Sequence, residues 1–145
     1  IYHSRVARSN VWGLTKMGAH VTLCGPQTLM PAAIEQMGVN VTCNLEHALR
    51  DADVVMGLRI QRERLQGVFL STLREYHRYF GIHEDSIRLC KKDVLIMHPG
   101  PVNRGVELSS AVVDADNSVI NEQVTNGVAV RMALLYLLTR KDDKR

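Results

Sequence analysis

The chain has 145 residues, 46% of them hydrophobic and 23% charged, a composition typical of one globular domain that excludes a disordered, collagenous or coiled-coil protein. Its formal net charge of +3 is too small to favour nonspecific nucleic-acid binding, so we expect no nucleic-acid partner. No window approaches roughly 18 uninterrupted apolar residues, and residues 1–5 lack the apolar core of a signal peptide, so we expect a cytoplasmic protein that does not enter a membrane.

Four short runs rich in β-branched residues have the length of strands. Apolar residues at helical spacing fill the stretches between them, and a glycine follows the first two of these stretches as a helix stop. We also expect residues 1–2 to end a truncated first strand, which leads into the first helix with Ser9 as its N-cap. The predicted strands are residues 20–24, 39–43, 54–57 and 94–98, and the predicted helices are residues 11–17, 32–37 and 45–52.

The strict alternation of strands and helices predicts right-handed crossovers and parallel strands. The expected fold class is therefore α/β, a three-layer, doubly wound, Rossmann-like parallel sheet with helices on both faces. A long apolar segment from Val124 to Leu138 predicts a terminal helix of roughly 18 residues. Its apolar positions occupy more than one face, so we expect it to pack partly against something outside this chain. Residues 139–145 form a charged tail.

In open α/β sheets ligands bind outside the carboxyl ends of the strands, and three segments of this kind carry suitable groups. Residues 2–10 combine Arg5, a second arginine and several hydroxyls at a helix N-terminus, an arrangement that can bind an anion or can simply cap a helix. The second segment follows the strand that ends at Gly57. There Arg59 can bind a carboxylate through two parallel hydrogen bonds, Gln61 adds an amide, and Glu63 can support Arg59.

The third segment, residues 98–107, follows the last predicted strand. Pro99 and Pro101 flank Gly100 and lack N–H donors, which leaves carbonyl oxygens as the groups most available to a ligand amino group. The segment lacks the Lys-Ser/Thr pair of a phosphate-binding loop, so we do not expect a nucleotide there. His98 can serve as a general acid or base, or as a hydrogen-bonded structural group.

The cysteines and histidines predict neither a metal site nor a cofactor. Cys24, Cys43 and Cys90 are odd in number and widely spaced, without a Cys-x-x-Cys pair, which fits reduced thiols. Residues 83–85 are His-Glu-Asp, which fits the acidic first turn of a helix better than a metal site.

Together, His3-Ser4-Arg5-Val6-Ala7-Arg8-Ser9-Asn10, Leu58-Arg59-Ile60-Gln61-Arg62-Glu63-Arg64 and His98-Pro99-Gly100-Pro101-Val102-Asn103-Arg104-Gly105 resemble the catalytic chains of bacterial aspartate carbamoyltransferases. The resemblance implies that residues 1–138 form the aspartate-binding domain and that the domain for carbamoyl phosphate is absent from this chain. It also implies a transferase of pyrimidine biosynthesis that acts as a homotrimer, with other pyrimidine-pathway subunits as further partners.

The same resemblance implies roles for individual residues. Arg5 and Arg59 would bind the two carboxylates of L-aspartate, with Gln61 assisting and Glu63 supporting Arg59. The backbone of Pro99, Gly100 and Pro101 would face carbamoyl phosphate. Some family members carry leucine where this chain has Gly100, which leaves the carbonyl role intact.

The implied reaction transfers the carbamoyl group to the amine of aspartate and releases phosphate, without a cofactor. No catalytic residue is assigned within this half, and we expect the 145-residue chain alone to be inactive. Two alternatives remain open. One is an ornithine-type enzyme, which the absence of its His-Cys-Leu-Pro motif disfavours; the other is a noncatalytic binding or assembly module, which intact Arg5, Arg59 and Gln61 disfavour.

Overall fold

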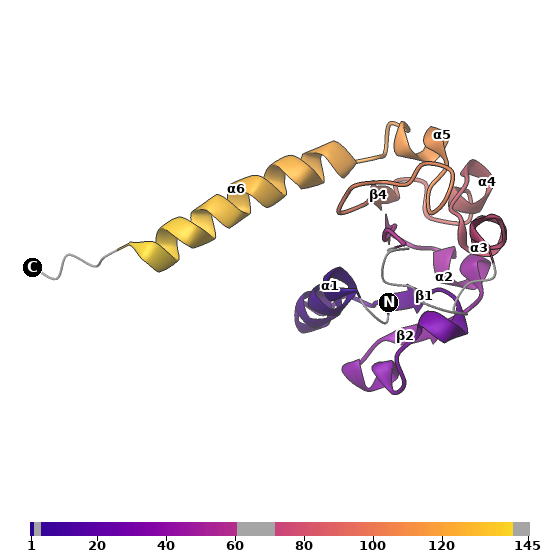
Figure 1. Ribbon diagram of the computed structural model, residues 1–145, viewed down its shortest axis with the longest axis horizontal. Coiled ribbons are helices and arrows are strands. Elements are labelled where there is room, and N and C mark those ends of the chain that lie inside the picture. Colours follow the sequence, from indigo (N-terminus) through magenta and orange to yellow (C-terminus); the bar gives the residue numbers. More distant parts are fainter. Residues whose placement is uncertain (2–3, 61–71, 141–145) are drawn as a thin grey trace, which may run out of the picture.

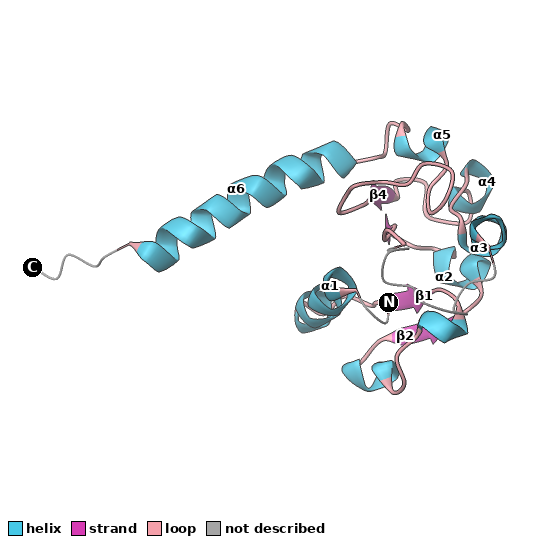
Figure 2. Ribbon diagram, in the orientation of Figure 1, coloured by secondary structure: helices cyan, strands magenta, loops and turns pink. Residues whose placement is uncertain are grey.

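The computed structural model describes residues 1, 4–60 and 72–140. Helices and strands alternate along the first part of the chain, as expected for the α/β class (Figure 2). The strands are β1 (Thr22–Cys24), β2 (Asn40–Thr42), β3 (Val54–Met56) and β4 (Leu95–Met97). The helices are α1 (Arg5–Lys16), the 3-10 helices η1 (Gln27–Leu29) and η2 (Ile34–Met37), α2 (Leu45–Leu49), α3 (Leu73–Phe80), α4 (Glu84–Ile87), α5 (Ser110–Val113) and α6 (Ile120–Thr139).

All strand pairing within the described elements is parallel. Strand β1 pairs with β2, with Leu23 opposite Val41, and β3 pairs with β4, with Val55 opposite Ile96. The predicted strands and their parallel direction are therefore confirmed. The prediction of one parallel sheet differs from the structure, in which the described strands form two separate two-stranded sheets.

The start of the first helix differs from the prediction. Ser4 is the N-cap, and its Oγ accepts a hydrogen bond from the backbone N–H of Ala7 at 3.1 Å. Ser9 lies inside α1, where its hydroxyl donates to the carbonyl of Val6. Both serines are good capping residues, but the earlier start allows Ala7 and Val11 to be buried on one face of the helix.

The second predicted helix is only a short 3-10 helix, η2. It follows Ala33, a residue in the left-handed region with φ of 61°, and ends at Gly38, whose φ of 78° is favourable only for glycine. The glycine stop was therefore placed correctly. The α-helix was not, because the preceding backbone does not enter the right-handed helical region.

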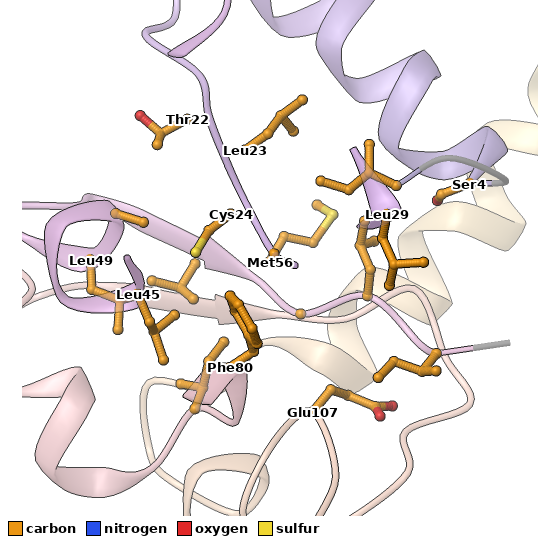
Figure 3. Close-up of a pocket in the computed structure, with 18 of the residues that line it drawn as sticks. Ser4, Thr22, Leu23, Cys24, Leu29, Leu45, Leu49, Met56, Phe80 and Glu107 are labelled. Carbon is orange, nitrogen blue, oxygen red and sulfur yellow. The ribbon is translucent and has the colours of Figure 1, made fainter. Parts of the chain in front are cut away.

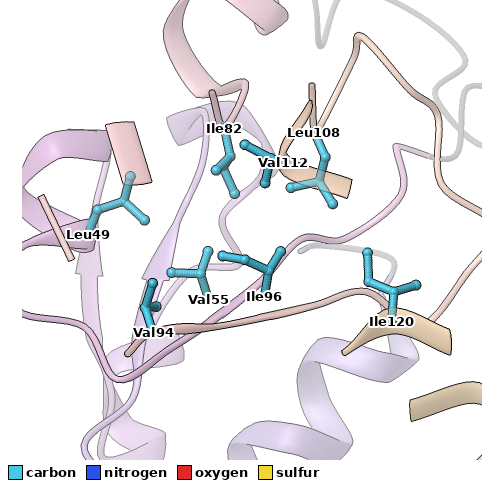
Figure 4. Packing of buried hydrophobic residues seen from close by; sticks show 8 residues of the cluster. All are labelled: Leu49, Val55, Ile82, Val94, Ile96, Leu108, Val112 and Ile120. Atoms are coloured by element: carbon cyan, nitrogen blue, oxygen red, sulfur yellow. The ribbon is translucent and has the colours of Figure 1, made fainter. Parts of the chain in front are cut away.

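Two hydrophobic clusters hold the molecule together. The smaller one packs α1 and η2 against β1 and contains Val11, Leu23, Met30, Ile34 and Val39. The larger one, here called the main core, surrounds β3 and β4 (Figure 4). The main core consists of Leu49, Val55, Ile82, Val94, Ile96, Leu108, Val112 and Ile120.

Helix α6 projects away from the rest of the molecule (Figure 1). Its first residue, Ile120, belongs to the main core, and Ile120 is the helix's one buried residue. The apolar side chains further along, including Val124, Leu134 and Leu138, are exposed. Despite its length and apolar content, neither α6 nor another described helix meets the requirements for crossing a membrane.

Candidate functional site

A cavity of about 230 Å³ lies between strands β1 and β3. Leu23 and Cys24 of β1 and Val55 and Met56 of β3 line it, and side chains from α2 and α3 complete its apolar wall (Figure 3). The lining continues beyond the carboxyl ends of both strands, through Gly25 and Gly57 and the residues that follow them. This is the end of a parallel sheet at which α/β proteins bind their ligands.

The three segments singled out in the sequence all contribute to this cavity. Its lining includes Ser4 from the first segment, Arg59 from the second and Glu107 from the third. Ser4, Arg59 and Glu107 are far apart in the sequence, so the fold brings them together. The lining thus combines an apolar wall with a hydroxyl, a guanidinium and a carboxylate.

The first segment places Arg5 at the N-terminus of α1. Arg5 is the first residue of the helix and is exposed, directly after the capping residue Ser4. The N-terminus of a helix carries partial positive charge, and a neighbouring guanidinium adds to it. Arg5 and the helix N-terminus together therefore favour the binding of an anion. The cavity lining includes Ser4 but not Arg5.

The second segment brings Arg59 to the end of β3. The backbone N–H of Gly57 still bonds to the carbonyl of Met97, at 2.9 Å, so the sheet pairing continues to two residues before Arg59. Arg59 is exposed, between the half-buried Leu58 and the buried Ile60. The predicted partners Gln61 and Glu63 lie outside the described residues.

The third segment forms a loop between β4 and α5. Pro99 and Gly100 are half-buried and Pro101 is exposed, and the Gly100–Pro101 peptide is cis. Gly100 has a φ of 70°, in the left-handed region that favours glycine. Two buried side chains, His98 and Glu107, lie at the two ends of this loop.

Among the residues that the structure describes, no group of three or more His, Cys, Asp or Glu side chains could hold a metal ion. Cys24 lines the cavity, but its burial raises the pKa of its thiol to about 11, and the neighbouring Cys43 acts in the same direction. A thiol with such a pKa is protonated at neutral pH and is a weak nucleophile. The arrangement is suited to binding and orienting small charged ligands.

Comparison with known families agrees with this arrangement. The family model described as "Aspartate/ornithine carbamoyltransferase, Asp/Orn binding domain" matches residues 2–138. The chain belongs to this family. All three candidate segments lie within the matched range.

The catalytic subunits of two bacterial aspartate carbamoyltransferases are close in sequence to this carbamoyltransferase domain. The subunit from Acetivibrio thermocellus is 64% identical over 98% of this chain, and the subunit from Ruminiclostridium cellulolyticum is 63% identical over 97%. The alignments cover 46% and 45% of those proteins. This chain therefore spans somewhat less than half the length of the relatives it matches.

Solved carbamoyltransferase structures share the fold. The ornithine carbamoyltransferase of Thermus thermophilus superimposes with a TM-score of 0.79, covering 93% of this chain and 45% of that one, at 18% identity. The enzyme of Pyrococcus furiosus gives a TM-score of 0.70 over 85% of this chain and 42% of its own, at 25% identity. These neighbours confirm the predicted α/β, Rossmann-like class.

Sequence reasoning missed Tyr76 as a residue of the cavity, and it included Glu107 in the third segment without assigning it a role. Tyr76 lies on α3, where its ring stacks on Phe80 with 5.5 Å between the ring centroids. Burial, and then the nearby charge of Glu107, raise the pKa of the Tyr76 hydroxyl well above its usual value. A helical Tyr-x-x-x-Phe pair is a common packing pattern, so the sequence held no signal that this face lines a cavity.

Proposed function

We propose that this chain is the aspartate-binding half of an aspartate carbamoyltransferase, with residues 1–138 as the domain and residues 139–145 as a charged tail. The observation that carries the proposal is the convergence of Ser4, Arg59 and Glu107 on one cavity at the carboxyl ends of the strands. The family membership gives the reaction type. The choice of aspartate over ornithine rests on the names of the relatives that are 64% and 63% identical.

In the proposed reaction the amine of L-aspartate attacks the carbonyl carbon of carbamoyl phosphate. A C–N bond forms, the C–O bond to phosphate breaks, and the nitrogen passes a proton to the departing phosphate, which gives N-carbamoyl-L-aspartate and phosphate. Arg5 and Arg59 bind the two carboxylates with help from Gln61, and Glu63 supports Arg59. The backbone at Pro99, Gly100 and Pro101 faces the carbamoyl group. Such a site works by positioning and by stabilising the developing negative charge.

The other half of the enzyme supplies most of the carbamoyl phosphate site in this proposal. We therefore expect the 145-residue chain alone to lack carbamoyl transfer, because both substrates must be held in one site. We further propose that the complete enzyme acts in the cytoplasm, in pyrimidine biosynthesis, as a homotrimer that can associate with other subunits of the pathway. Sedimentation of the full-length protein tests the trimer.

The direct test measures the full-length protein that contains this domain. We expect carbamoylation of aspartate and at least a hundredfold lower kcat/KM with ornithine, because a cationic side chain does not suit two arginines. Carbamoylation of ornithine at the higher rate would reassign the substrate. No transfer to either amino acid would favour a noncatalytic module.

The substitution Arg59→Lys tests the carboxylate site, because lysine keeps the charge and loses the two-pronged geometry. A lost charge-assisted hydrogen bond costs roughly 1.5 to 3 kcal/mol, so kcat/KM for aspartate should fall by about 10- to 150-fold. The matched control is Arg88→Lys, since Arg88 pairs with Asp85 on the surface and does not line the cavity. If Arg59→Lys stayed within twofold of the parent, or mainly lowered Tm, Arg59 would be a structural residue.

A further inference from the structure

His98 is fully buried at the end of β4, and both of its ring nitrogens face polar groups. Its Nδ1 accepts a hydrogen bond from the backbone N–H of Gly100, at 2.9 Å. An accepting Nδ1 carries no proton, so in the neutral ring the proton resides on Nε2. The structure therefore selects one tautomer of His98 and directs its Nε2–H away from the loop backbone.

Glu107 is the group that this Nε2–H faces. Its Oε1 lies 3.3 Å from His98 Nε2, and only 2% of the side chain is exposed. Among the described residues, His98 Nε2 and Glu107 Oε2 have no hydrogen-bond partner of standard geometry. The carboxylate of Glu107 is therefore the polar group next to a buried Nε2 that otherwise lacks a partner, and it faces this nitrogen with Oε1.

Glu107 also binds the middle of the loop and is itself fixed to a neighbouring segment. Its Oε1 accepts a hydrogen bond from the backbone N–H of Asn103 at 2.7 Å. Its carbonyl accepts one from the backbone N–H of Ile82 at 3.0 Å, which ties Glu107 to the segment before α4. Glu107 therefore anchors both the ring of His98 and the turn at Asn103.

The bond to His98 Nδ1 sets the direction of one peptide group. Pro99 and Pro101 have no N–H, so Gly100 supplies the only backbone donor of these three residues. The N–H and C=O of a planar trans peptide point in opposite directions. With the Gly100 N–H directed at His98, the carbonyl of Pro99 is directed away from the ring, and no described residue donates a backbone hydrogen bond to it.

The other side of the His98 ring packs against the end of β3. A Cβ placed on Gly57 would lie 3.1 Å from Cδ2 of His98, which shows how close the ring is to this backbone. Gly57 is two residues before Arg59. The same ring therefore contacts the strand end that carries the proposed aspartate-binding arginine and the loop that carries the proposed carbamoyl-binding carbonyls.

We infer that His98 is a positioning residue held by Glu107, and that its Nδ1 orients the Pro99 carbonyl toward the carbamoyl nitrogen of carbamoyl phosphate. This inference rests on the proposed function. It predicts that the two nitrogens of His98 have separable effects. The loss of the Nδ1 acceptor should weaken carbamoyl phosphate binding, whereas the loss of the contact with Glu107 alone should matter less.

The test uses two variants of the full-length enzyme, His98→Asn and His98→Gln. The Asn amide can place its oxygen near the position of Nδ1 and accept the Gly100 N–H, whereas the Gln amide reaches the position of Nε2 and Glu107. Both variants remove the ring from Gly57, so they are matched for lost packing. We expect KM for carbamoyl phosphate to rise roughly 3- to 10-fold more in His98→Gln than in His98→Asn.

The substitution Glu107→Gln provides a second measurement, because the amide oxygen can still accept hydrogen bonds from Asn103 and His98. We expect it to retain the KM for carbamoyl phosphate within about threefold, whereas Glu107→Ala, which loses both the contact with His98 and the bond from Asn103, should raise this KM further, but less than His98→Gln does. Equal KM values in the two His98 variants, or changes in Tm alone, would reduce His98 to a packing residue and overturn the inference. If the parent neither bound carbamoyl phosphate nor transferred its carbamoyl group, this result would overturn the proposed function itself.

Discussion

The main core and helix α6 are both rich in large aliphatic residues, but they differ completely in burial. Ile96 and Leu108 of the main core are 0% exposed, whereas Leu134 and Leu138 of α6 are 54% and 81% exposed. The main core is assembled from strands, short helices and loops that are distant in sequence. Helix α6 contributes only Ile120 to this cluster, and in its first turn Gln123 Oε1 accepts a hydrogen bond from the backbone N–H of His98 at 2.9 Å. Apolar composition alone therefore does not determine which residues of this chain form a core.

The difference has a local cause. A helix satisfies its own backbone hydrogen bonds, so a 20-residue segment that holds four leucines, two alanines and a methionine can be helical with few tertiary contacts. A three-residue strand such as β4 cannot form without tertiary contacts, because its hydrogen bonds come from β3 and from residues 117–119. The strands consequently form where a neighbouring segment pairs with them, and the central residues Val55 and Ile96 are buried while Val54 and Leu95 are exposed.

The substitution Ile96→Ala should have the largest effect on stability. Ile96 is fully buried in the main core, so its truncation loses transfer free energy and leaves a cavity, at a cost of about 2 to 5 kcal/mol in the free energy of unfolding. Urea denaturation of the chain measures it.

The matched control is Leu134→Ala in α6, where the side chain is half-exposed and alanine has the higher helix propensity. The free energy of unfolding should change by less than about 0.5 kcal/mol. A loss above about 2 kcal/mol at Leu134 would mean that α6 packs on the body in solution, and it would remove the contrast between the two regions.

The substitution Gly57→Ala should have the next largest effect, because it overfills the main core. The added Cβ would lie 3.1 Å from His98 and 3.2 Å from Leu108, so these side chains must move, at about 1 to 3 kcal/mol. Gly13→Ala is the control, since a Cβ at this position of α1 has nothing within 4 Å and alanine favours the helix. In thermal melting, the Tm of Gly57→Ala should be lower than that of the parent, and the Tm of Gly13→Ala should be unchanged or higher.

Much of the fold could be predicted from the sequence, because strand and helix periods are local signals. The β-branched run at residues 94–98 predicts β4, which the structure places at Leu95–Met97. The start of α1 was misplaced at Ser9, because Ser4 and Ser9 are equally good caps and only the burial of Ala7 distinguishes them. The separation into two sheets has no local signal at all.

The candidate site was predictable in part. The positions after the strands identified Arg59 and the 98–107 loop, since the carboxyl ends of parallel strands meet at one edge. The pairing of His98 with Glu107 was not predictable, because the two are separated by an irregular loop in which no periodicity relates side chains. Gln61 and Glu63 lie outside the described residues, so their roles stay predictions.

The substitution Gly127→Pro should affect helix α6 without affecting the main core, and spectroscopy can distinguish the two effects. Proline in the interior of α6 removes a backbone hydrogen bond and should lower the helical circular dichroism signal. The free energy of unfolding of the main core in urea should change by less than about 0.5 kcal/mol, since Ile120 and Gln123 hold the helix to the body and Gly127 lies beyond both. Loss of both signals together would indicate that α6 and the body unfold as one unit.

The smallest effect is expected at the surface of α5, a helix that also reaches the main core through the buried Val112. Asp114, which caps the carboxyl end of α5, accepts two hydrogen bonds from Arg104, with N–O distances of 2.6 and 2.7 Å, and these bonds lower the pKa of its carboxyl. A carboxyl whose pKa is lower when folded adds stability above its unfolded pKa, about 3.9, and loses it as the pH falls through the folded value.

The variant Asp114→Asn should therefore melt slightly below the parent at neutral pH, with the difference shrinking as the pH falls below about 4. Added salt should also reduce it, because both side chains are largely exposed. Val112→Ala, two residues away on α5, should lower Tm by a larger amount at every pH, since it removes buried methyl groups and no charge. Melting curves of both variants across this pH range measure the contrast. If Asp114→Asn lowered Tm by the same amount at every pH, the carboxylate would act through packing and not through its charge.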